Sequence, residues 1–212
     1  YYRLLSEFML QQTQVKTVIP YFKKFTDKFR TLHSLSNCSE KQILKHWEGL
    51  GYYRRARNLL ASSKILVKKN NSKLPKNINK IKELPGVGNY TANALLGLVH
   101  NQATIAIDGN VKRIFSRILN IKEEKIDFNE LVEKNKKKLF NNSGRNSDFV
   151  EAVMEFGALI CKPKLPECRV CNIKNFCISY KLKKVFKTKN TKTIIKKNYD
   201  IFCYLSRKKR KI

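Results

Sequence analysis

The sequence predicts an all-α protein in which a main helical domain is followed by a smaller cysteine-rich unit. Apolar residues recur every three or four positions across residues 4–120, for example at Val15, Val18 and Ile19, and this is the period of an amphipathic helix. No segment there shows the strict alternation of a half-buried strand. Turn-forming residues divide the pattern into five or six helices, with expected breaks at 33–39, 49–51, 70–76, 85–88 and 101–109.

The second half of the chain predicts a separate unit. Helical patterns cover residues 128–140 and 147–160, and the latter leads directly into the cysteine-rich segment 161–177. We therefore expect one domain over residues 1–120, a second over 121–180 and a basic segment over 181–212. Alternation at 201–205 favours a linker followed by the truncated start of a further domain, and a basic disordered arm is the alternative.

The charge of the chain points to a polyanionic partner. Its 45 Lys and Arg residues against 16 Asp and Glu residues give a formal net charge of +29, and nucleic acid is the first candidate partner. A nucleotide bias in the encoding genome would also enrich lysine and asparagine, so composition alone leaves both interpretations open. We find neither an apolar run of about 18 residues nor a signal segment, and therefore expect a cytoplasmic protein without a membrane partner.

Four cysteines form the most specific motif. Cys161, Cys168, Cys171 and Cys177 have the spacing C-x6-C-x2-C-x5-C, and four thiolates are the number that ligates a [4Fe-4S] cluster. Structural zinc usually uses two close cysteine pairs, whereas only one such pair is present here. Disulfides are disfavoured in an intracellular protein. The spacing therefore favours an iron-sulfur cluster over zinc, disulfides or unrelated thiols.

A glycine-containing turn suggests a phosphate-binding hairpin. Residues 84–89 read Leu-Pro-Gly-Val-Gly-Asn. Gly86 and Gly88 allow backbone angles closed to other residues, so consecutive amides can point at one phosphate, and the next helix adds the positive end of its dipole. Such a hairpin grips the DNA backbone without reading its sequence. A plain turn between helices is the alternative.

Two carboxylates lie in apolar stretches, where an unpaired charge is costly. They are Glu7, in Ser-Glu-Phe-Met-Leu, and Asp108, in Ile-Asp-Gly-Asn-Val. A partly buried Glu has a raised pKa and can hold a proton for a leaving group, while an Asp beside helix amides stays ionised. Cleavage of a glycosidic bond needs such a pair. Alternatively, Glu7 is an exposed first-turn residue and Asp108 a helix N-cap, a role compatible with catalysis.

Several longer strings carry a family resemblance. SEFMLQQTQVKTVIPYF, GLGYYRRARNL, LPGVGNYTANA and AIDGNVKRIFSRIL, together with the cysteines, span residues 1 to about 180. In sequence and order they resemble the MutY-type adenine DNA glycosylases of the endonuclease III superfamily. The resemblance implies the helix-hairpin-helix DNA glycosylase fold, with a six-helix barrel domain, a hairpin element at about 77–100 and an iron-sulfur cluster domain. It also implies that the [4Fe-4S] cluster organises a basic loop and is not the catalyst.

The resemblance assigns roles to three residues. Glu7 would protonate adenine at N7, and Asp108 would stabilise the sugar cation or trap it covalently. Endonuclease III relatives place a lysine at position 90, where an amine can attack C1′ and lead to strand cleavage. Tyr90 therefore implies a monofunctional glycosylase. Glu7 and the Gln-Gln-Thr-Gln run favour adenine over thymine as the excised base.

The implied partner is double-stranded DNA with adenine opposite 8-oxoguanine or guanine, bound by a monomer in the nucleoid. Two alternatives belong to other classes of protein: an endonuclease III-like or thymine-mismatch glycosylase, and a non-catalytic DNA-binding iron-sulfur module. Tyr90, Glu7 and Asp108 favour the active adenine enzyme over both.

Excision requires that the base leave the stack, which needs a pocket and side chains that fill the gap. By resemblance, Gln12 and Tyr52 are the candidate wedges, and Glu155 contacts the flipped adenine. A solvated helix residue and an aromatic core residue are the alternatives for Gln12 and Tyr52. The other residues expected to contact DNA are Pro85, Gly86, Val87, Gly88 and Asn110. Three arginines contact phosphates or form a solvated basic face, and these are Arg54, Arg55 and Arg57.

Overall fold

A computed structural model of the chain describes residues 1–140 and 144–184. This described part is built from helices and contains no strand, which confirms the all-α fold class. The possible strand at 201–205 and most of the basic segment lie outside the described residues. The helices are α1 (Tyr2–Leu10), α2 (Val15–Lys28), α3 (Leu32–Ser36), α4 (Glu40–Trp47), α5 (Arg54–Asn70), α6 (Ile78–Lys82), α7 (Asn89–His100), α8 (Gly109–Leu119), η1 (Glu123–Lys125), α9 (Phe128–Lys134), α10 (Lys136–Leu139), α11 (Asn146–Leu159), η2 (Lys174–Phe176) and α12 (Ile178–Lys181).

The first 120 residues contain eight helices, so the prediction of five or six is wrong. The short helix α3 overlaps the expected break at 33–39, and Thr31 and Ser34 form a capping box at its start. The short helix α6 is capped by Asn77, whose side chain accepts hydrogen bonds from two backbone amides. A helix of one turn is too short to show a period of 3.6 residues, so its cap is its main signal in the sequence.

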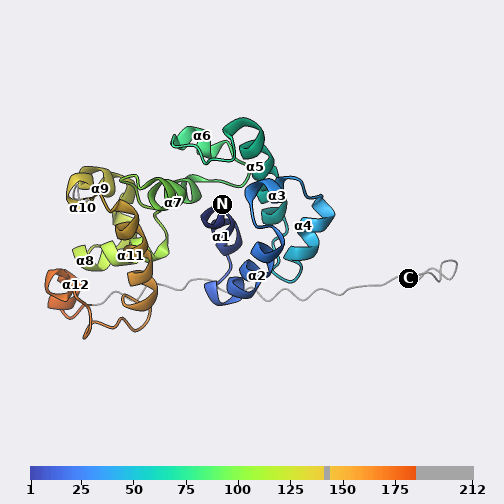
Figure 1. Ribbon diagram of the computed structural model, residues 1–212. Coiled ribbons are helices and arrows are strands. Elements are labelled where there is room, and N and C mark those ends of the chain that lie inside the picture. The colour runs from blue at the N-terminus through green and yellow to red at the C-terminus, as the bar shows by residue number, and fades with distance from the viewer. Residues whose placement is uncertain (141–143, 185–212) are drawn as a thin grey trace, which may run out of the picture.

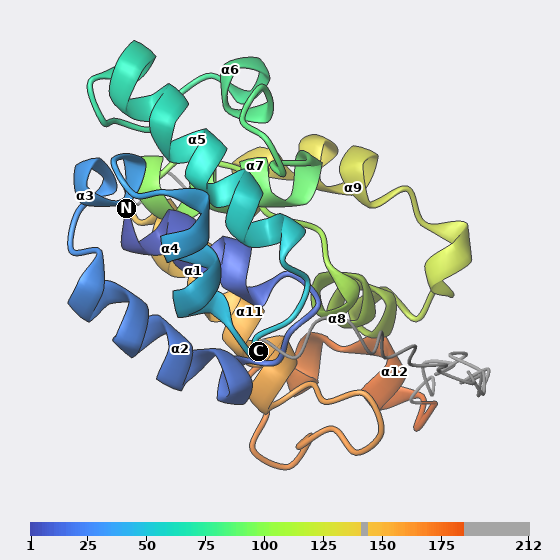
Figure 2. The ribbon, with the colours of Figure 1, turned by 90° about the vertical axis from the view of Figure 1, so that its right-hand side faces the viewer.

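The described helices enclose two hydrophobic cores. Helices α1 to α7 surround the larger one, which includes Phe8, Phe25 and Trp47. Helices α8 to α11 contribute to the smaller one, around Val111 and Val150. Figure 1 shows α8 to α12 on one side of the molecule and α2 to α5 on the other, with α1 and α7 between them. In Figure 2, α8 lies beside α12, against which it packs.

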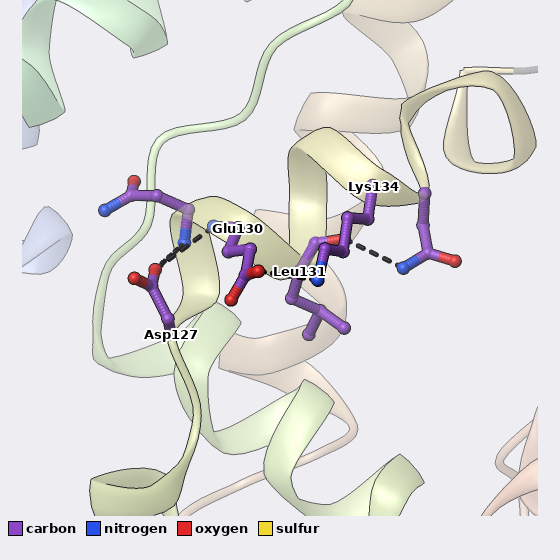
Figure 3. A network of polar contacts seen from close by, with 6 residues as sticks. Asp127, Glu130, Leu131 and Lys134 are labelled. Carbon is purple, nitrogen blue, oxygen red and sulfur yellow. Dashed lines mark hydrogen bonds and ion pairs between the residues drawn. The ribbon is translucent and has the colours of Figure 1, made fainter.

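Local polar contacts fix the beginning of α9 (Figure 3). The side chain of Asp127 accepts hydrogen bonds from two backbone amides of the first turn, at 3.0 and 3.1 Å. Lys134 pairs with Glu130 one turn earlier at 2.6 Å, and Asn135 Nδ2 donates to the carbonyl of Leu131 at 2.9 Å. The ion pair is exposed to solvent and contributes little to stability, so the cap determines where the helix begins. None of the described helices is long and apolar enough to cross a membrane.

Candidate active site and DNA-facing surface

Glu7 lies on the buried face of α1. Its neighbours Leu4 and Phe8 belong to the larger core, and Glu7 itself is only 5% exposed. Burial raises the pKa of Glu7 to about 7, and the nearby charge of Arg3 opposes the shift only partly. No hydrogen bond or ion pair joins the Glu7 carboxyl to another residue of 1–140 or 144–184. The side chain can therefore hold a proton near neutral pH.

Asp108 is the N-cap of α8, as its position before Gly109 predicts. Its Oδ1 accepts a hydrogen bond from the backbone amide of Val111 at 2.8 Å, and its Oδ2 accepts one from Asn110 Nδ2 at 2.9 Å. Both oxygens are thus held in place at the positive end of a helix, an environment that stabilises a carboxylate anion.

Tyr90 connects the two acids. It lies in the first turn of α7 and is 36% exposed. Burial and the charges of Glu7 and Asp108 raise the pKa of Tyr90 above its ordinary value. The phenol therefore keeps its proton at neutral pH. The charges of both carboxylates influence the Tyr90 hydroxyl, so the three predicted residues lie in one region, where α1 packs against α7.

The predicted hairpin joins α6 to α7 and packs closely against two other helices. Gly86 has φ +80°, and a Cβ there would lie 2.7 Å from Asn58 Nδ2 and 2.9 Å from Phe8 Cε1. Only glycine fits both this backbone angle and this space. Gln11 Nε2 donates to the carbonyl of Gly86 at 3.1 Å, and Ser62 Oγ donates to that of Pro85 at 3.0 Å.

The end of the hairpin differs from its middle. Val87 is buried, whereas Gly88 is the N-cap of α7 and has open space around its Cβ position. Beyond it, the free amides of the first turn of α7 provide donors for an anion.

Gln12 and Tyr52 lie on one side of the molecule, in two separate turns. Both line the same shallow depression, together with Gln11 and Asn58. Tyr52 is 61% exposed, so it is a surface residue and not part of a core. Both have left-handed backbone angles, φ 57° for Gln12 and φ 49° for Tyr52, which are uncommon for residues other than glycine.

Arg55 is not available to phosphates, because it is only 5% exposed. Its guanidinium donates to backbone carbonyls of both turns that carry Gln12 and Tyr52. One signal in the sequence indicates this position: Arg55 shares the helical register of the buried Leu59 and Leu66. Its neighbour Arg54 is exposed, and Arg57 forms an exposed ion pair with Glu40 at 2.6 Å, as on a solvated face.

Asn110 is partly buried, and its side chain is held by hydrogen bonds. Its Nδ2 donates to Asp108, and its Oδ1 accepts from Arg113 Nη2 at 2.7 Å. It also packs against Gly157 of α11, where an added Cβ would lie 2.6 Å from the Cβ of Asn110. Glu155 is exposed on α11, and no hydrogen bond or ion pair within the described ranges joins it to Glu7, Tyr90 or Asp108.

Two buried arginines of α8 attach this helix to the cysteine-rich segment. Arg113 Nε donates to the carbonyl of Cys161 at 2.8 Å. Arg117 donates to the carbonyls of Lys162 and Pro163, both at 2.7 Å, and its Nη1 lies 3.3 Å from Cys161 Sγ. The helix that begins at Asp108 therefore also organises the loop of the first cysteine.

All four predicted ligands, Cys161, Cys168, Cys171 and Cys177, line one cavity beneath α8 and α11, with apolar side chains completing its wall. None of them forms a disulfide. Within residues 1–140 and 144–184, no three His, Cys, Asp or Glu side chains are close enough together to hold a single metal ion. The four thiols therefore share one cavity and are not linked by disulfides.

Comparison with known proteins identifies the family. The family described as HhH-GPD superfamily base excision DNA repair protein matches residues 5–141. The adenine DNA glycosylase of Buchnera aphidicola subsp. Baizongia pistaciae (strain Bp) is 40% identical over 207 residues, which cover 96% of this chain and 59% of the relative.

Eukaryotic relatives are similar as well. The adenine DNA glycosylases of Schizosaccharomyces pombe and Homo sapiens are 38% and 37% identical, with 89% and 82% of this chain and 41% and 32% of their own lengths covered. The chain therefore spans 59% or less of the length of these three relatives.

Solved structures share the fold. A thermostable thymine-DNA glycosylase has a TM-score of 0.73 and 25% identity, covering 86% of this chain and 84% of its own. Endonuclease III in a trapped covalent intermediate with DNA has a TM-score of 0.67 and 24% identity, covering 85% and 84%. The helix-hairpin-helix glycosylase fold is thereby confirmed.

Proposed function

Because the chain belongs to the HhH-GPD superfamily of base excision DNA repair proteins, we propose that it is an adenine DNA glycosylase acting on adenine opposite 8-oxoguanine or guanine. Relatives of that name, at 37% to 40% identity, support adenine as the base. The observation that carries the proposal is the pairing of a buried Glu7, which keeps its proton near neutral pH, with an Asp108 carboxylate fixed at a helix N-terminus.

The two acids divide the work of breaking the glycosidic bond. Glu7 gives its proton to N7 of adenine as the C1′–N9 bond breaks and its electron pair passes to the base. Asp108 stabilises the positive charge left on the sugar, or bonds to C1′ until water replaces it. Water adds to C1′ and loses a proton, and the products are free adenine and an abasic site.

Tyr90 makes strand cleavage through a Schiff base unavailable at this position. A Schiff base at C1′ requires an amine, whereas Tyr90 presents a phenol that keeps its proton. The phenol feels the charge of both acids and would orient the water or the sugar.

The DNA-facing surface would hold the duplex while the base leaves the stack. The amides after Gly88 would bind a backbone phosphate, Gln12 and Tyr52 would enter the gap, and Glu155 would contact the flipped adenine. Asn110 would contact DNA only with the hydrogen-bonding capacity that Asp108 and Arg113 leave free.

The cysteine cavity fits an iron-sulfur cluster. In a [4Fe-4S] cube each thiolate binds a different iron atom, so the four sulfurs stay farther apart than around one zinc ion. Cys161, Cys168, Cys171 and Cys177 would be the ligands, and Arg117 would donate to the sulfur of the first. When bound, the cluster supplies structural cross-links between parts of this loop.

The proposed domain boundary differs from the one expected at residue 120. The larger core draws on α1 to α7 and the smaller one on Ile105 and the helices after it, with Leu98 of α7 packed against it, so we place the boundary between the barrel and cluster domains near residues 101–108 instead of residue 120. We propose that the protein acts as a monomer on DNA in the cytoplasm.

The test is excision from a duplex that carries adenine opposite 8-oxoguanine. We expect free adenine to be released while the strand stays intact until alkali is added. Failure to release adenine, or immediate strand scission that borohydride traps as a covalent adduct, contradicts the proposal. A parallel duplex with thymine opposite guanine tests the activity named for the thymine-DNA glycosylase of similar fold, and we expect no thymine release.

A further inference from the structure

We propose that Arg55 is a positioning residue for base extrusion, which holds the turns carrying Gln12 and Tyr52 in the geometry needed to enter the duplex. This inference rests on the proposed function, because the wedge roles of Gln12 and Tyr52 belong to it.

The guanidinium of Arg55 bridges two segments far apart in the sequence. Its Nη1 donates to the carbonyls of Met9 and Gln11 at 2.5 and 2.6 Å, at the end of α1. Its Nη2 donates to the carbonyls of Leu50 and Gly51 at 3.3 and 3.1 Å, in the turn before α5. The last carbonyls of a helix lack partners within the helix, so Arg55 also caps α1.

The bonded carbonyls come directly before the two wedge residues. Gln11 precedes Gln12, and Gly51 precedes Tyr52. Any movement of the guanidinium therefore shifts the backbone from which each wedge starts. A buried cation with this many backbone acceptors is held strongly, because each bond is charge-assisted.

The ring of Tyr52 also contacts the guanidinium. The Arg55 carbon Cζ lies 5.2 Å from the centre of the Tyr52 ring and 5.5 Å from that of the buried Trp47. Trp47 Nε1 donates to the carbonyl of Gly51 at 3.1 Å, and this bond also fixes the turn that carries Tyr52. The cation thus holds the Tyr52 ring from one side, while 61% of the residue stays open to solvent.

Both wedge residues keep backbone angles that ordinary residues avoid. The φ values of 57° and 49° at Gln12 and Tyr52 cost energy, and such angles persist only where the surroundings fix them. Lysine cannot replace the fork of donors, because its ammonium is a point charge that cannot span both groups of carbonyls.

The first experiment compares Arg55→Lys with Arg30→Lys, the same substitution at an exposed arginine. The full chain is mixed with a duplex in which 2-aminopurine replaces the target adenine, and the fluorescence rise reports extrusion. We expect Arg55→Lys to slow extrusion about 10- to 100-fold with unchanged far-UV circular dichroism, and Arg30→Lys to match the wild type.

A double variant separates positioning from general destabilisation. Tyr52→Asn removes the wedge and keeps a residue that tolerates the left-handed angle. If Arg55 acts through Tyr52, then Arg55→Lys adds little to the loss that Tyr52→Asn alone causes. Wild-type extrusion by Arg55→Lys, or fully multiplicative losses in the double variant, would overturn the proposal.

Hydrogen exchange of the wild type gives a test that does not depend on the folding of any variant. Turns fixed by Arg55 are ordered in the free protein, so we expect the hydrogen-bonded amides of Thr13 and Leu50 to be protected before any DNA is added. Exchange of both amides at the rate of an unstructured chain in the free protein would mean that Arg55 does not hold these turns, and would refute its role.

The outcomes also distinguish this inference from the proposed function. Normal extrusion without release of adenine would reject the glycosylase activity and leave the role of Arg55 intact. Release of adenine by the wild type and equally by Arg55→Lys would reject only the role of Arg55.

Discussion

At the scale of single residues, Glu7 combines a proton affinity suited to catalysis with a cost to folding. Its carboxyl is buried and unpaired in the described part of the chain, and its pKa rises from 4.5 to about 7. The same desolvation that keeps the proton available at neutral pH penalises the charged form in the folded state.

We expect the rate of excision to fall as pH rises through about 7, because the protonated form of Glu7 is lost there. Glu7→Gln should lower the rate by about 10²- to 10⁴-fold while DNA affinity stays nearly unchanged. Single-turnover assays and binding titrations across this pH range measure both, with the exposed Glu133→Gln as control. A comparable loss of affinity and rate in Glu7→Gln would make Glu7 structural.

The titration of Glu7 should also make the stability of the folded protein depend on pH. The folded pKa of about 7 lies above the ordinary 4.5, so the stabilising contribution of the protonated group is complete below pH 4.5 and is lost as pH rises to about 7. At higher pH the buried charge costs about 3 kcal/mol. Glu7→Gln should therefore raise the melting temperature at about pH 8 and change it little at about pH 4. A pH-independent difference would show that Glu7 does not titrate in this way.

At the scale of elements, the hairpin depends on one of its two glycines for space. Gly86 combines a φ of +80° with close contacts to Asn58 and Phe8, whereas Gly88 has an ordinary angle and open surroundings. Replacing each glycine with alanine, which adds a methyl group, should therefore affect the stability of the fold differently at the two positions.

We expect Gly86→Ala to destabilise the fold by about 2 kcal/mol or more, through the backbone angle and overpacking together. Gly88→Ala should change the free energy of unfolding by less than about 1 kcal/mol. Urea unfolding followed by circular dichroism measures both variants. Equal effects would mean that the hairpin does not pack against α1 and α5 as described.

The elements also reveal what a sequence can and cannot predict. The longer helices and the hairpin are predicted because a period or a motif repeats locally. The turn at 11–14 cannot be predicted in this way, because it contains neither glycine nor proline. It is held instead by Arg55, which donates to the carbonyl of Gln11 from 44 residues away in the sequence. Likewise, Glu7 and Asp108 are each recognisable from local context. That the charges of both act on Tyr90 depends on tertiary packing.

At the scale of the whole molecule, the cysteine-rich loop depends on few apolar contacts of its own. Many of its large apolar side chains are exposed, including Leu165, Val170 and Phe176. The arginines of α8 supply hydrogen bonds that order this loop, and the proposed cluster would add further bonds to it.

We expect the purified protein to absorb visible light near 400 nm and to contain iron and acid-labile sulfide, because of the proposed cluster. Cys168→Ser should lose this absorbance and most DNA binding, whereas Cys38→Ser, in the larger core, should keep the colour. Iron analysis and absorbance measure the outcome. A colourless wild type that contains zinc would reject the cluster.

The division into two cores has a consequence for how the proposed activity would be lost on heating or in denaturant. Glu7 belongs to a helix of the larger core, and Asp108 begins a helix of the smaller one. Their separation is therefore a property of the junction, where Arg3 of α1 pairs with Glu151 of α11 at 2.9 Å. We expect mild heat or denaturant that loosens this junction to stop the proposed excision while both halves are still folded, and substitutions at the junction to change its rate without altering either acid.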